Sequence, residues 1–382
     1  EAVGLVREQV EVIESLKAGY IAVWGAGKSG IAAAHLLAHH GCDVTVYDDR
    51  TTEHLVAQLG SVPFKLVGGG LSYEGHTLIV LSPGILPHSE SIKALLNAGI
   101  PFVSEVEVAL LLTDVPVIAI TGTDGKSTTS AMIDHVLNHA GRKSLVCGNF
   151  GIPVSTVVLN EDALDCLVVE ISAFQLWSTQ RFEPRVAVIT NIAEDHLDYF
   201  EGDFQRYRDA KLRVFKDMNG GQVVFRQDCY SDFHELVANS NSVVAFDANS
   251  SEPKWALLDG NLTHDGNAFM SSQSLRVVGL HNVNNALSTA AAVHFMGVDL
   301  PDIAAGLSTF TGLPHRMEYV RTVSGVDFYN DSKATNPHAA QTGINAMGSS
   351  LIVIAGGYDK GLELNAFAQV LSQQKFVVLT GP

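Results

Sequence analysis

Two apolar segments of this chain each run into a glycine-rich turn that opens a helix, and this repeated arrangement is what most restricts the fold. The first is a strand predicted at 20–24, followed by Gly25-Ala26-Gly27-Lys28-Ser29-Gly30 and a helix to His40. The second is a strand predicted at 115–120, followed by the turn 122–128. Such turns present backbone N–H groups that bind phosphate. Strands that alternate with helices form a parallel sheet, so the predicted fold class is α/β.

The alternation restarts twice along the 382 residues, which predicts three domains at 1–104, 105–312 and 313–382. A length of roughly 100–200 residues per domain agrees with this number. The predicted strands are 20–24, 43–47, 64–67, 78–81 and 101–103 in the first unit, 115–120, 144–147, 166–170, 186–190 and 222–225 in the second, with a β-rich segment at 242–270, and 326–329, 351–355 and 376–379 in the third.

Composition excludes several classes of protein. A hydrophobic fraction of 46% with 17% charged residues excludes a disordered chain. The net charge of −17 argues against a nucleic-acid partner, which needs a basic face. No apolar run reaches the roughly 18 residues that a membrane span needs. The cysteines form no CxxC pair, which favours a reducing cytoplasm over a disulfide framework or a zinc site; they are Cys42, Cys147, Cys166 and Cys229.

The first glycine-rich turn has the GxGxxG pattern of a dinucleotide-binding unit. Asp48 and Asp49 end the next predicted strand, where an acid could bind a ribose hydroxyl. Taken alone, this pattern predicts NAD. Other phosphate ligands use the same geometry, and glycines needed only for packing would look alike, so these alternatives stay open.

The second turn, Gly122-Thr123-Asp124-Gly125-Lys126-Ser127-Thr128, is a short P-loop. Its N–H groups would surround phosphates, Lys126 would reach the β and γ oxygens, and Ser127 can ligate Mg²⁺. Ile120 stands where the full motif has its first glycine, but the strand–loop–helix context supports the assignment.

Polar residues also follow the predicted strands at 166–170 and 186–190. Glu170 ends the first, and Asn191, Glu194, Asp195 and His196 follow the second. The carboxyl ends of parallel strands line a ligand crevice, and carboxylates near a P-loop fit Mg²⁺. Each residue alone would more often be a helix cap or a solvated acid.

Four cations have two interpretations each. Lys211, on a predicted helix, reads by itself as part of a solvated basic face. Lys333, in Asp331-Ser332-Lys333-Ala334-Thr335-Asn336-Pro337, marks either an anion site or a capped helix start. Arg316, at a predicted linker, and Lys360, in a glycine turn, could reach a site or belong to ordinary surface loops.

In this order, the motifs resemble those of the Mur ligase family over residues 20–382. The resemblance is carried by 122–128, 170–176, 191–198, 207–213, His281-Asn282 with Asn285, 312–316, 331–336 and Ser82-Pro83-Gly84-Ile85. It implies a Rossmann-like first domain that holds the UDP part of a substrate rather than NAD. It further implies a P-loop ATPase-like central domain and a Rossmann-like third domain that contacts nucleotide and amino acid.

The resemblance also implies a role for individual residues. The UDP-substrate would contact Lys28, Ser29, Asp48, Asp49, Arg50, Ser82 and Gly84, with Asn149 and Gln175 on its muramyl-alanine arm. ATP would contact Gly122, Thr123, Asp124, Gly125, Lys126, Ser127, Thr128, Asn282, Arg316, Asp331 and Lys333. The amino acid would contact Lys333, Thr335 and Lys360. Two Mg²⁺ ions would be held by Ser127, Glu170, His196 and a carbamylated Lys211, so that the catalytic residues are Lys126, His196 and Lys211.

The implied activity is amide-bond formation. ATP would phosphorylate the terminal carboxylate of UDP-N-acetylmuramoyl-L-alanine, and the amine of D-glutamate would displace the phosphate, in a monomeric cytoplasmic enzyme of peptidoglycan precursor synthesis. Three alternatives remain: a nicotinamide oxidoreductase, a nucleotide-binding protein without the ligase step, and a ligase for another amino acid. Separate from these, Asp124 stands where relatives often have Asn, which leaves its phosphate contact open.

The third unit is short. From Leu313 to Pro382 it spans 70 residues and holds only three predicted strands, whereas a doubly wound domain usually has about five or six. The last strand, at 376–379, is apolar enough to be central in a sheet. We therefore expect the native protein to continue beyond Pro382, and the 382-residue form to bind UDP-substrate and ATP but D-glutamate poorly.

Overall fold

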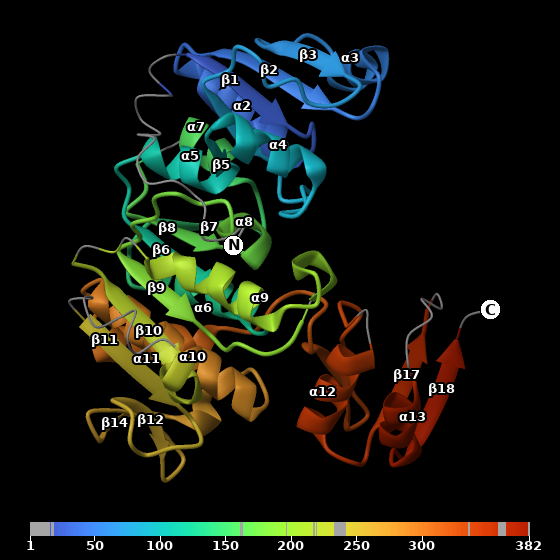
Figure 1. Cartoon of the computed structure of the whole chain (residues 1–382). Coiled ribbons are helices and arrows are strands. Elements are labelled where there is room, and N and C mark those ends of the chain that lie inside the picture. Colours follow the sequence, from blue (N-terminus) through green and yellow to red (C-terminus); the bar gives the residue numbers. More distant parts are fainter. Residues whose placement is uncertain are drawn as a thin grey trace.

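The structure, a computed structural model, describes residues 16, 19–160, 163–195, 197–216, 218, 220–232, 242–334, 337–357 and 364–380. Three α/β units follow one another along the chain, with the third lying beside the second (Figure 1). The predicted α/β fold with three units is therefore confirmed. None of the described helices is long and apolar enough to cross a membrane.

The first unit is a five-stranded parallel sheet. Its strands are β1 (Tyr20–Trp24), β2 (Asp43–Asp48), β3 (Lys65–Gly68), β4 (Leu78–Leu81) and β5 (Phe102–Ser104), in the order β3-β2-β1-β4-β5. The helices are α2 (Lys28–His39), α3 (Thr52–Leu59) and α4 (Glu90–Ala98). Three consecutive residues of β1, Ile21, Ala22 and Val23, are fully buried, as expected of a central strand covered on both faces.

Helix α5 (Glu105–Leu111) connects the first unit to the second, and its two buried carboxylates accept backbone hydrogen bonds from the second unit. Glu105 accepts one from the N–H of Ser155 at 2.7 Å. Glu107 accepts two, from Gln180 at 2.6 Å and Arg181 at 2.7 Å. These bonds satisfy N–H groups of the second unit and so fix α5 against it.

The second unit contains a nine-stranded sheet that is parallel except at one edge. The strand order is β14-β13-β12-β11-β10-β9-β6-β8-β7, with antiparallel pairing of β12 with β13 and of β13 with β14. The strands are β6 (Val117–Thr121), β7 (Ser144–Gly148), β8 (Cys166–Glu170), β9 (Val186–Ile189), β10 (Gln222–Arg226), β11 (Ser242–Asp247), β12 (Trp255–Leu258), β13 (Asn261–His264) and β14 (Asn267–Ser271).

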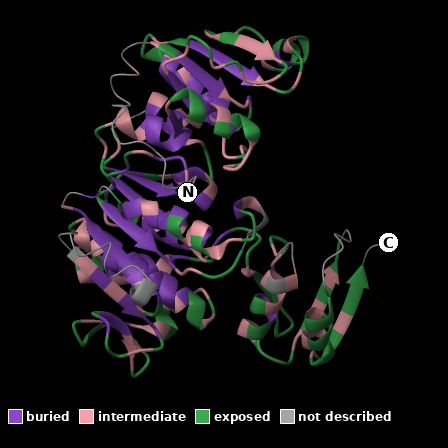
Figure 2. Cartoon of the chain, in the orientation of Figure 1, coloured by how far each residue is buried: buried purple, intermediate pink, exposed green. Residues whose placement is uncertain are grey.

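Helices cover both faces of this sheet, so its central strands are buried throughout (Figure 2). On β6, Ile118 and Ile120 face a core shared with α6 (Lys126–His139), α10 (Leu280–Phe295) and α11 (Leu300–Thr309). Val117 and Ala119 face the opposite core, which contains residues of α7 (Val154–Leu159), α8 (Ala173–Leu176) and α9 (Phe204–Leu212). This alternation is the period of two that a strand imposes on its side chains.

The third unit differs from the prediction of three strands in one parallel sheet. An additional strand, β15 (Glu318–Val323), pairs antiparallel with β16 (Val326–Asn330) through a tight turn at Ser324 and Gly325, both with positive φ. A separate pair, β17 (Ile352–Gly356) and β18 (Phe376–Thr380), is parallel, with helices α12 (Pro337–Met347) and α13 (Asn365–Ser372). Strand β16 therefore belongs to a hairpin, which the prediction missed.

The last strand, which the sequence analysis describes as apolar enough to be central, is exposed in the part of the chain that is described. There, β18 pairs with β17 alone. Phe376 and Leu379 of β18 are 61% and 74% exposed, and Ile354 of β17 is 72% exposed. Figure 2 shows the contrast with the purple, buried sheets of the first two units.

Candidate active site

The P-loop lies at the carboxyl end of β6, where it is tied to the end of the neighbouring strand β9. The N–H of Asp124 donates to Oδ1 of Asn191 at 2.9 Å, and the side chains of Thr190 and Asn191 both donate to the carbonyl oxygen of Asp124. Thr123 is bonded in the same way to Ala193, whose N–H donates to its Oγ1 at 3.0 Å. The loop is therefore held in shape by protein contacts before any phosphate binds.

Glycine is required at two positions of this loop. Gly122 has φ +144°, and a Cβ there would lie 2.0 Å from Oγ1 of Thr190. Gly125 has φ +81° and precedes the first residue of α6, and its Cβ would lie 2.6 Å from Oδ1 of Asn285. At both positions a side chain would be strained and would also collide with the residues that support the loop.

Two lysine ammonium groups converge on the carbonyl oxygen of Gly122. Nζ of Lys126 donates to it at 2.9 Å and to the carbonyl oxygen of Thr123 at 2.7 Å. Nζ of Lys211, from α9, donates to it at 2.6 Å. Lys211 is only 2% exposed, so the interpretation of this residue as part of a solvated basic face is wrong. Its position is set by the packing of α9, which its own sequence does not reveal.

The environment lowers the pKa of both lysines. Burial, together with the nearby positive charge of Lys126, lowers the pKa of Lys211 to about 7. Burial likewise lowers the pKa of Lys126, against the opposing effect of Glu170 and Asp124. Lys211 also lies over the ring of Tyr207, with Nζ 4.5 Å from the ring centre. A buried lysine of this kind is often found at functional sites.

Glu170, at the end of β8, presents one free carboxylate oxygen to this region. Its Oε1 accepts a hydrogen bond from Nδ2 of Asn149 at 2.7 Å, whereas its buried Oε2 has no hydrogen-bond partner among the residues that the structure describes. Burying a carboxylate oxygen without a partner costs free energy unless a cation or a water molecule binds it. Together with the partly buried Ser127 in the first turn of α6, it offers the oxygen ligands that Mg²⁺ prefers.

The amino end of α10 lies against the P-loop. Thr129 of α6 donates to Oδ1 of Asn285 at 3.2 Å, and Nδ2 of Asn285 donates to Oδ1 of Asn282 at 3.2 Å. Asn282 is buried and donates to the carbonyl oxygen of Val278. Thr128, also predicted at the ATP site, is buried in the first turn of α6.

The third unit brings several of its predicted residues toward this edge. Arg316 is close enough to lower the pKa of both Lys126 and His281 of the second unit. Asp331 accepts a hydrogen bond from the N–H of Met317 at 3.0 Å, and burial raises its pKa. Nζ of Lys333 lies 5.0 Å from the ring centre of Phe150, which follows Asn149 in the second unit. Lys333 therefore spans the boundary between the two units.

In the first unit, Asp48 uses both carboxylate oxygens to hold the glycine-rich turn. Oδ2 accepts a hydrogen bond from the N–H of Ala26 at 2.7 Å, and Arg50 donates to both oxygens, at 2.6 and 2.9 Å. Arg50 also donates to the carbonyl oxygen of Ala26. The Arg50 guanidinium holds the pKa of Asp48 far below its usual range. These oxygens are thus engaged by protein groups.

The remaining predicted UDP-substrate residues surround the same turn. Oγ of Ser82, which follows β4, donates to the carbonyl oxygen of Gly25 at 3.1 Å. Lys28, Asp49 and Gly84 are exposed, and Ser29 is half-buried. Gln175 differs: its Oε1 accepts hydrogen bonds from both the N–H and the hydroxyl of Ser172, which closes a capping box at the start of α8.

Three predicted site residues, His196, Thr335 and Lys360, lie outside the described residues. Within the described ranges, no group of three or more His, Cys, Asp or Glu side chains is arranged to hold a metal ion. The metal site that the sequence predicts has a different composition, since it would also include Ser127, a modified Lys211 and His196, which lies outside the described residues.

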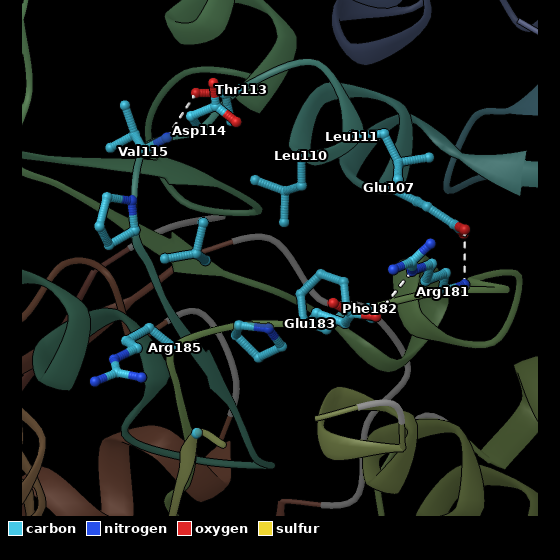
Figure 3. Close-up of a pocket in the computed structure, with 14 residues that line it drawn as sticks. Glu107, Leu110, Leu111, Thr113, Asp114, Val115, Arg181, Phe182, Glu183 and Arg185 are labelled. Atoms are coloured by element: carbon cyan, nitrogen blue, oxygen red, sulfur yellow. Dashed lines mark hydrogen bonds and ion pairs between the residues drawn. The ribbon is translucent and has the colours of Figure 1, made fainter. Parts of the chain in front are cut away.

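A pocket of about 430 Å³ lies at the opposite end of the middle sheet (Figure 3). Its lining includes Val117, the first residue of β6, with Pro116 just before it, and Arg185 just before β9. Glu107 of α5 and Arg181 border it, and the carboxylate of Glu107 accepts the Arg181 N–H there. The P-loop follows the other end of β6, so this pocket is separate from the candidate site.

Sequence reasoning missed several residues that shape the site. Thr190 and Asn285 support the P-loop and the start of α6 through hydrogen bonds. The ring of Phe150 lies against Nζ of Lys333, and Tyr199 contacts the loop that carries Ser82. Asn285 had a signal, since it belongs to one of the motifs quoted above. The other three act through contacts between distant segments, for which the chain has no local signal.

Comparison with known proteins assigns a family to each unit. Residues 19–104 match the Mur ligase MurD-like N-terminal domain, 120–293 the Mur ligase middle domain, and 315–382 the Mur ligase glutamate ligase domain. A UDP-N-acetylmuramoylalanine–D-glutamate ligase of Streptococcus uberis is 37% identical over 94% of this chain and 81% of its own length. One of Streptococcus pneumoniae is 38% identical over 97% of this chain and 84% of its own length.

Solved structures support the fold. The UDP-N-acetylmuramate–alanine ligase of Thermotoga maritima superposes with a TM-score of 0.58 at 22% identity, covering 94% of this chain and 84% of its own. A UDP-N-acetylmuramoylalanyl-D-glutamyl-2,6-diaminopimelate–D-alanyl-D-alanyl ligase of Acinetobacter baumannii has a TM-score of 0.60 at 18% identity, covering 91% of this chain and 73% of its own. At these identities the likeness concerns the fold.

Proposed function

Because this chain belongs to the Mur ligase family, we propose that it is an ATP-dependent ligase that adds D-glutamate to UDP-N-acetylmuramoyl-L-alanine. Its streptococcal relatives are named UDP-N-acetylmuramoylalanine–D-glutamate ligases, which supports these two substrates. The observation that carries the proposal is the convergence of Lys126 and Lys211 on Gly122, beside the unpaired oxygen of Glu170. At this loop Lys126 would neutralise phosphate charge, and Glu170 would hold Mg²⁺.

The first step transfers the γ-phosphoryl group. A carboxylate oxygen of the alanyl group forms a bond to the γ-phosphorus, and the bond from that phosphorus to the oxygen it shares with the β-phosphate breaks, releasing ADP. Catalysis of such a step consists mainly of positioning and charge neutralisation. Lys126 serves this purpose once its ammonium turns from the loop carbonyls to the β and γ oxygens.

The second step forms the amide. The amine nitrogen of D-glutamate attacks the acyl carbon, and the C–O bond to phosphate breaks, so that phosphate leaves with the electron pair. Of the two protons that the ammonium of D-glutamate loses, one ends on phosphate and the other goes to solvent. In this proposal the third unit delivers the amino acid, with Lys333, Thr335 and Lys360 as its contacts.

Two Mg²⁺ ions would neutralise the phosphate charge, and the donor set fits them. Ser127, Glu170, His196 and a carbamate on Lys211 would hold the ions. The fit rests on the buried, unpaired Oε2 of Glu170. Lys211 gains its carbamate when the lone pair of the neutral amine forms a bond to the carbon of CO₂ and the nitrogen loses a proton. Burial and the neighbouring Lys126 favour this neutral amine.

The remaining predicted site residues would bind the UDP-substrate or the adenine nucleotide. The first unit would bind UDP through Lys28, Ser29, Asp49, Ser82 and Gly84, with the turn shaped by Asp48 and Arg50. Asn149 and Gln175 would position the muramyl-alanine arm, although Oε1 of Gln175 is engaged in its capping box. Asn282, Arg316 and Asp331 would contact the nucleotide. The need for ATP and the four free cysteines favour the cytoplasm, and we expect a monomer.

The experiment that tests this function is ADP release over a panel of amino acids, with UDP-N-acetylmuramoyl-L-alanine as acceptor. ADP release that requires both the acceptor and D-glutamate would support the proposal. A different preferred amino acid would reassign the specificity, and ADP release independent of the acceptor would contradict a ligase. A nicotinamide absorbance assay separates the oxidoreductase alternative.

A further inference from the structure

Tyr199 connects the second unit, which is proposed to bind ATP, to the first unit, which is proposed to bind the UDP part of the other substrate. It lies in the short helix η1 (Leu197–Phe200) of the second unit, which follows the segment after β9. Its hydroxyl donates to the carbonyl oxygen of Ile85 at 2.6 Å, with the carbonyl oxygen of Pro83 at 3.2 Å. Both acceptors belong to the 82–85 loop of the first unit, which the sequence analysis associates with UDP.

The hydroxyl of Tyr199 has its full set of partners. Besides donating to the 82–85 loop, it accepts a hydrogen bond from Nε1 of Trp177 at 3.0 Å. Trp177 in turn packs against Phe102 of β5, with ring centres 5.8 Å apart. A half-buried tyrosine whose hydroxyl both donates and accepts is held in one orientation. Burial also raises the pKa of Tyr199, so the hydroxyl stays protonated.

The 82–85 loop is in contact with the glycine-rich turn of the first unit. Oγ of Ser82 donates to the carbonyl oxygen of Gly25, and a Cβ on Gly25 would lie 2.6 Å from that Oγ. Movement of the loop would therefore change the turn. A contact that fixes the loop also fixes the place where the UDP part of the substrate is proposed to bind.

On its other side, Tyr199 reaches the P-loop through aromatic rings. Its ring lies 5.0 Å from that of Phe200, which lies 5.7 Å from that of Tyr207. The hydroxyl of Tyr207 is hydrogen-bonded to Oγ1 of Thr123 at 3.1 Å. The rings of Tyr199, Phe200 and Tyr207 therefore form a continuous series of contacts from the 82–85 loop to the P-loop.

We propose that Tyr199 is a positioning residue that fixes the 82–85 loop relative to the P-loop, and so fixes the UDP-substrate relative to the phosphate it receives. The inference rests on the proposed function. It has a physical motive, because reacting atoms must come within about 3–3.5 Å, and here the two substrates are held by different units. Tyr199 does not touch the reacting atoms in this account.

The test compares Tyr199→Phe with Tyr47→Phe in the 382-residue chain. The first variant removes only the hydroxyl and keeps the rings in contact. The second removes a hydroxyl that is hydrogen-bonded within the first unit, to Nε2 of His76 at 3.0 Å, and is the matched control. Calorimetry measures the Kd of UDP-N-acetylmuramoyl-L-alanine and, separately, the Kd of Mg²⁺-ADP, and a thermal melt checks folding.

We expect Tyr199→Phe to raise the Kd of the UDP-substrate about three- to tenfold, the effect of one lost hydrogen bond, and to leave the Kd of Mg²⁺-ADP unchanged. Tyr47→Phe should change neither. Unchanged UDP-substrate affinity in Tyr199→Phe would overturn the inference alone. Parallel losses in both affinities with a lower melting temperature would reduce Tyr199 to a structural role and overturn it too. A wild-type chain that binds no UDP-substrate would instead refute the proposed function.

Discussion

Nζ of Lys211 lies 2.6 Å from the carbonyl oxygen of Gly122, the same oxygen that accepts a hydrogen bond from Lys126. Two ammonium groups on one acceptor repel each other, and burial adds to the cost of charging Lys211. The pair is relieved if Lys211 loses its proton. The neutral amine that results is the form of lysine that reacts with CO₂, as the proposed carbamate on Lys211 requires.

The first prediction is that Lys211 takes up CO₂ in a pH-dependent way. Its pKa of about 7 means that the neutral amine is scarce below pH 6 and predominates above pH 8. At a fixed total concentration of CO₂ and bicarbonate, the carbamate should therefore rise across this interval and then level off. ¹³C NMR with labelled bicarbonate should show a carbamate signal that is absent from Lys211→Arg. An identical signal in both proteins would contradict the assignment. Lys211→Ala should lose activity, and short carboxylic acids should partly restore it.

The second prediction concerns Lys126. Its cation would act on charge that develops on the transferred phosphoryl group, so Lys126→Ala should lower turnover at least about 10²–10³-fold with an unchanged melting temperature. The control is Lys143→Ala, which removes an exposed lysine far from the P-loop along the same unit. Steady-state ADP release gives the rates. Near wild-type turnover in Lys126→Ala would remove the P-loop from the mechanism.

The third prediction distinguishes the two reasons why the P-loop requires glycine at position 125: its positive φ and the lack of space for a Cβ. Gly125→Ala should weaken Mg²⁺-ATP binding at least about tenfold, because the new Cβ must displace Asn285 from its contact with the loop. Gly141, after the other end of α6, has a similar φ of +78° but open space around it. Gly141→Ala should therefore cost stability without changing ATP affinity. Calorimetry with a non-hydrolysable analogue decides, and equal affinities in the two variants would count against the supporting role of Asn285.

The fourth prediction concerns the first unit. Asp48→Asn removes the charge that holds Arg50 and weakens the bond to the N–H of Ala26, so the glycine-rich turn should loosen. Hydrogen bonds to charged groups contribute about 1.5–3 kcal/mol, and we expect UDP-substrate affinity to fall about tenfold or more. Asp43→Asn is the control, since it breaks an exposed ion pair with Lys65. Equal affinities would show that the Asp48 contact does not shape the binding turn.

Local pattern was enough to predict most of the fold. Strand β6 and the turn after it were recognisable because an apolar run meets glycines that a helix start requires, and Gly122 and Gly125 do adopt positive φ. The hairpin of β15 and β16 was not predicted, because Glu318–Val323 mixes polar and apolar residues without a clear buried face. The turn at Ser324-Gly325 was the one available signal for it.

The candidate site was predictable in its loops but not in its long-range contacts. Residues 122–128 carry their chemistry in their own order. Lys211, in contrast, reads as a surface lysine until α9 is packed over the P-loop, and its burial is a property of the assembled unit. The same holds for Lys333 over Phe150, since neither residue carries information about the other.

The most direct test of the whole account follows the oxygen atoms. UDP-N-acetylmuramoyl-L-alanine with both carboxylate oxygens replaced by ¹⁸O is incubated with this chain, Mg²⁺-ATP and D-glutamate, and the phosphate released is examined by mass spectrometry. An acyl-phosphate route moves one carboxylate oxygen into phosphate and leaves the other in the amide, so the account predicts phosphate that carries a single ¹⁸O. Phosphate released together with the amide product but without ¹⁸O would contradict it.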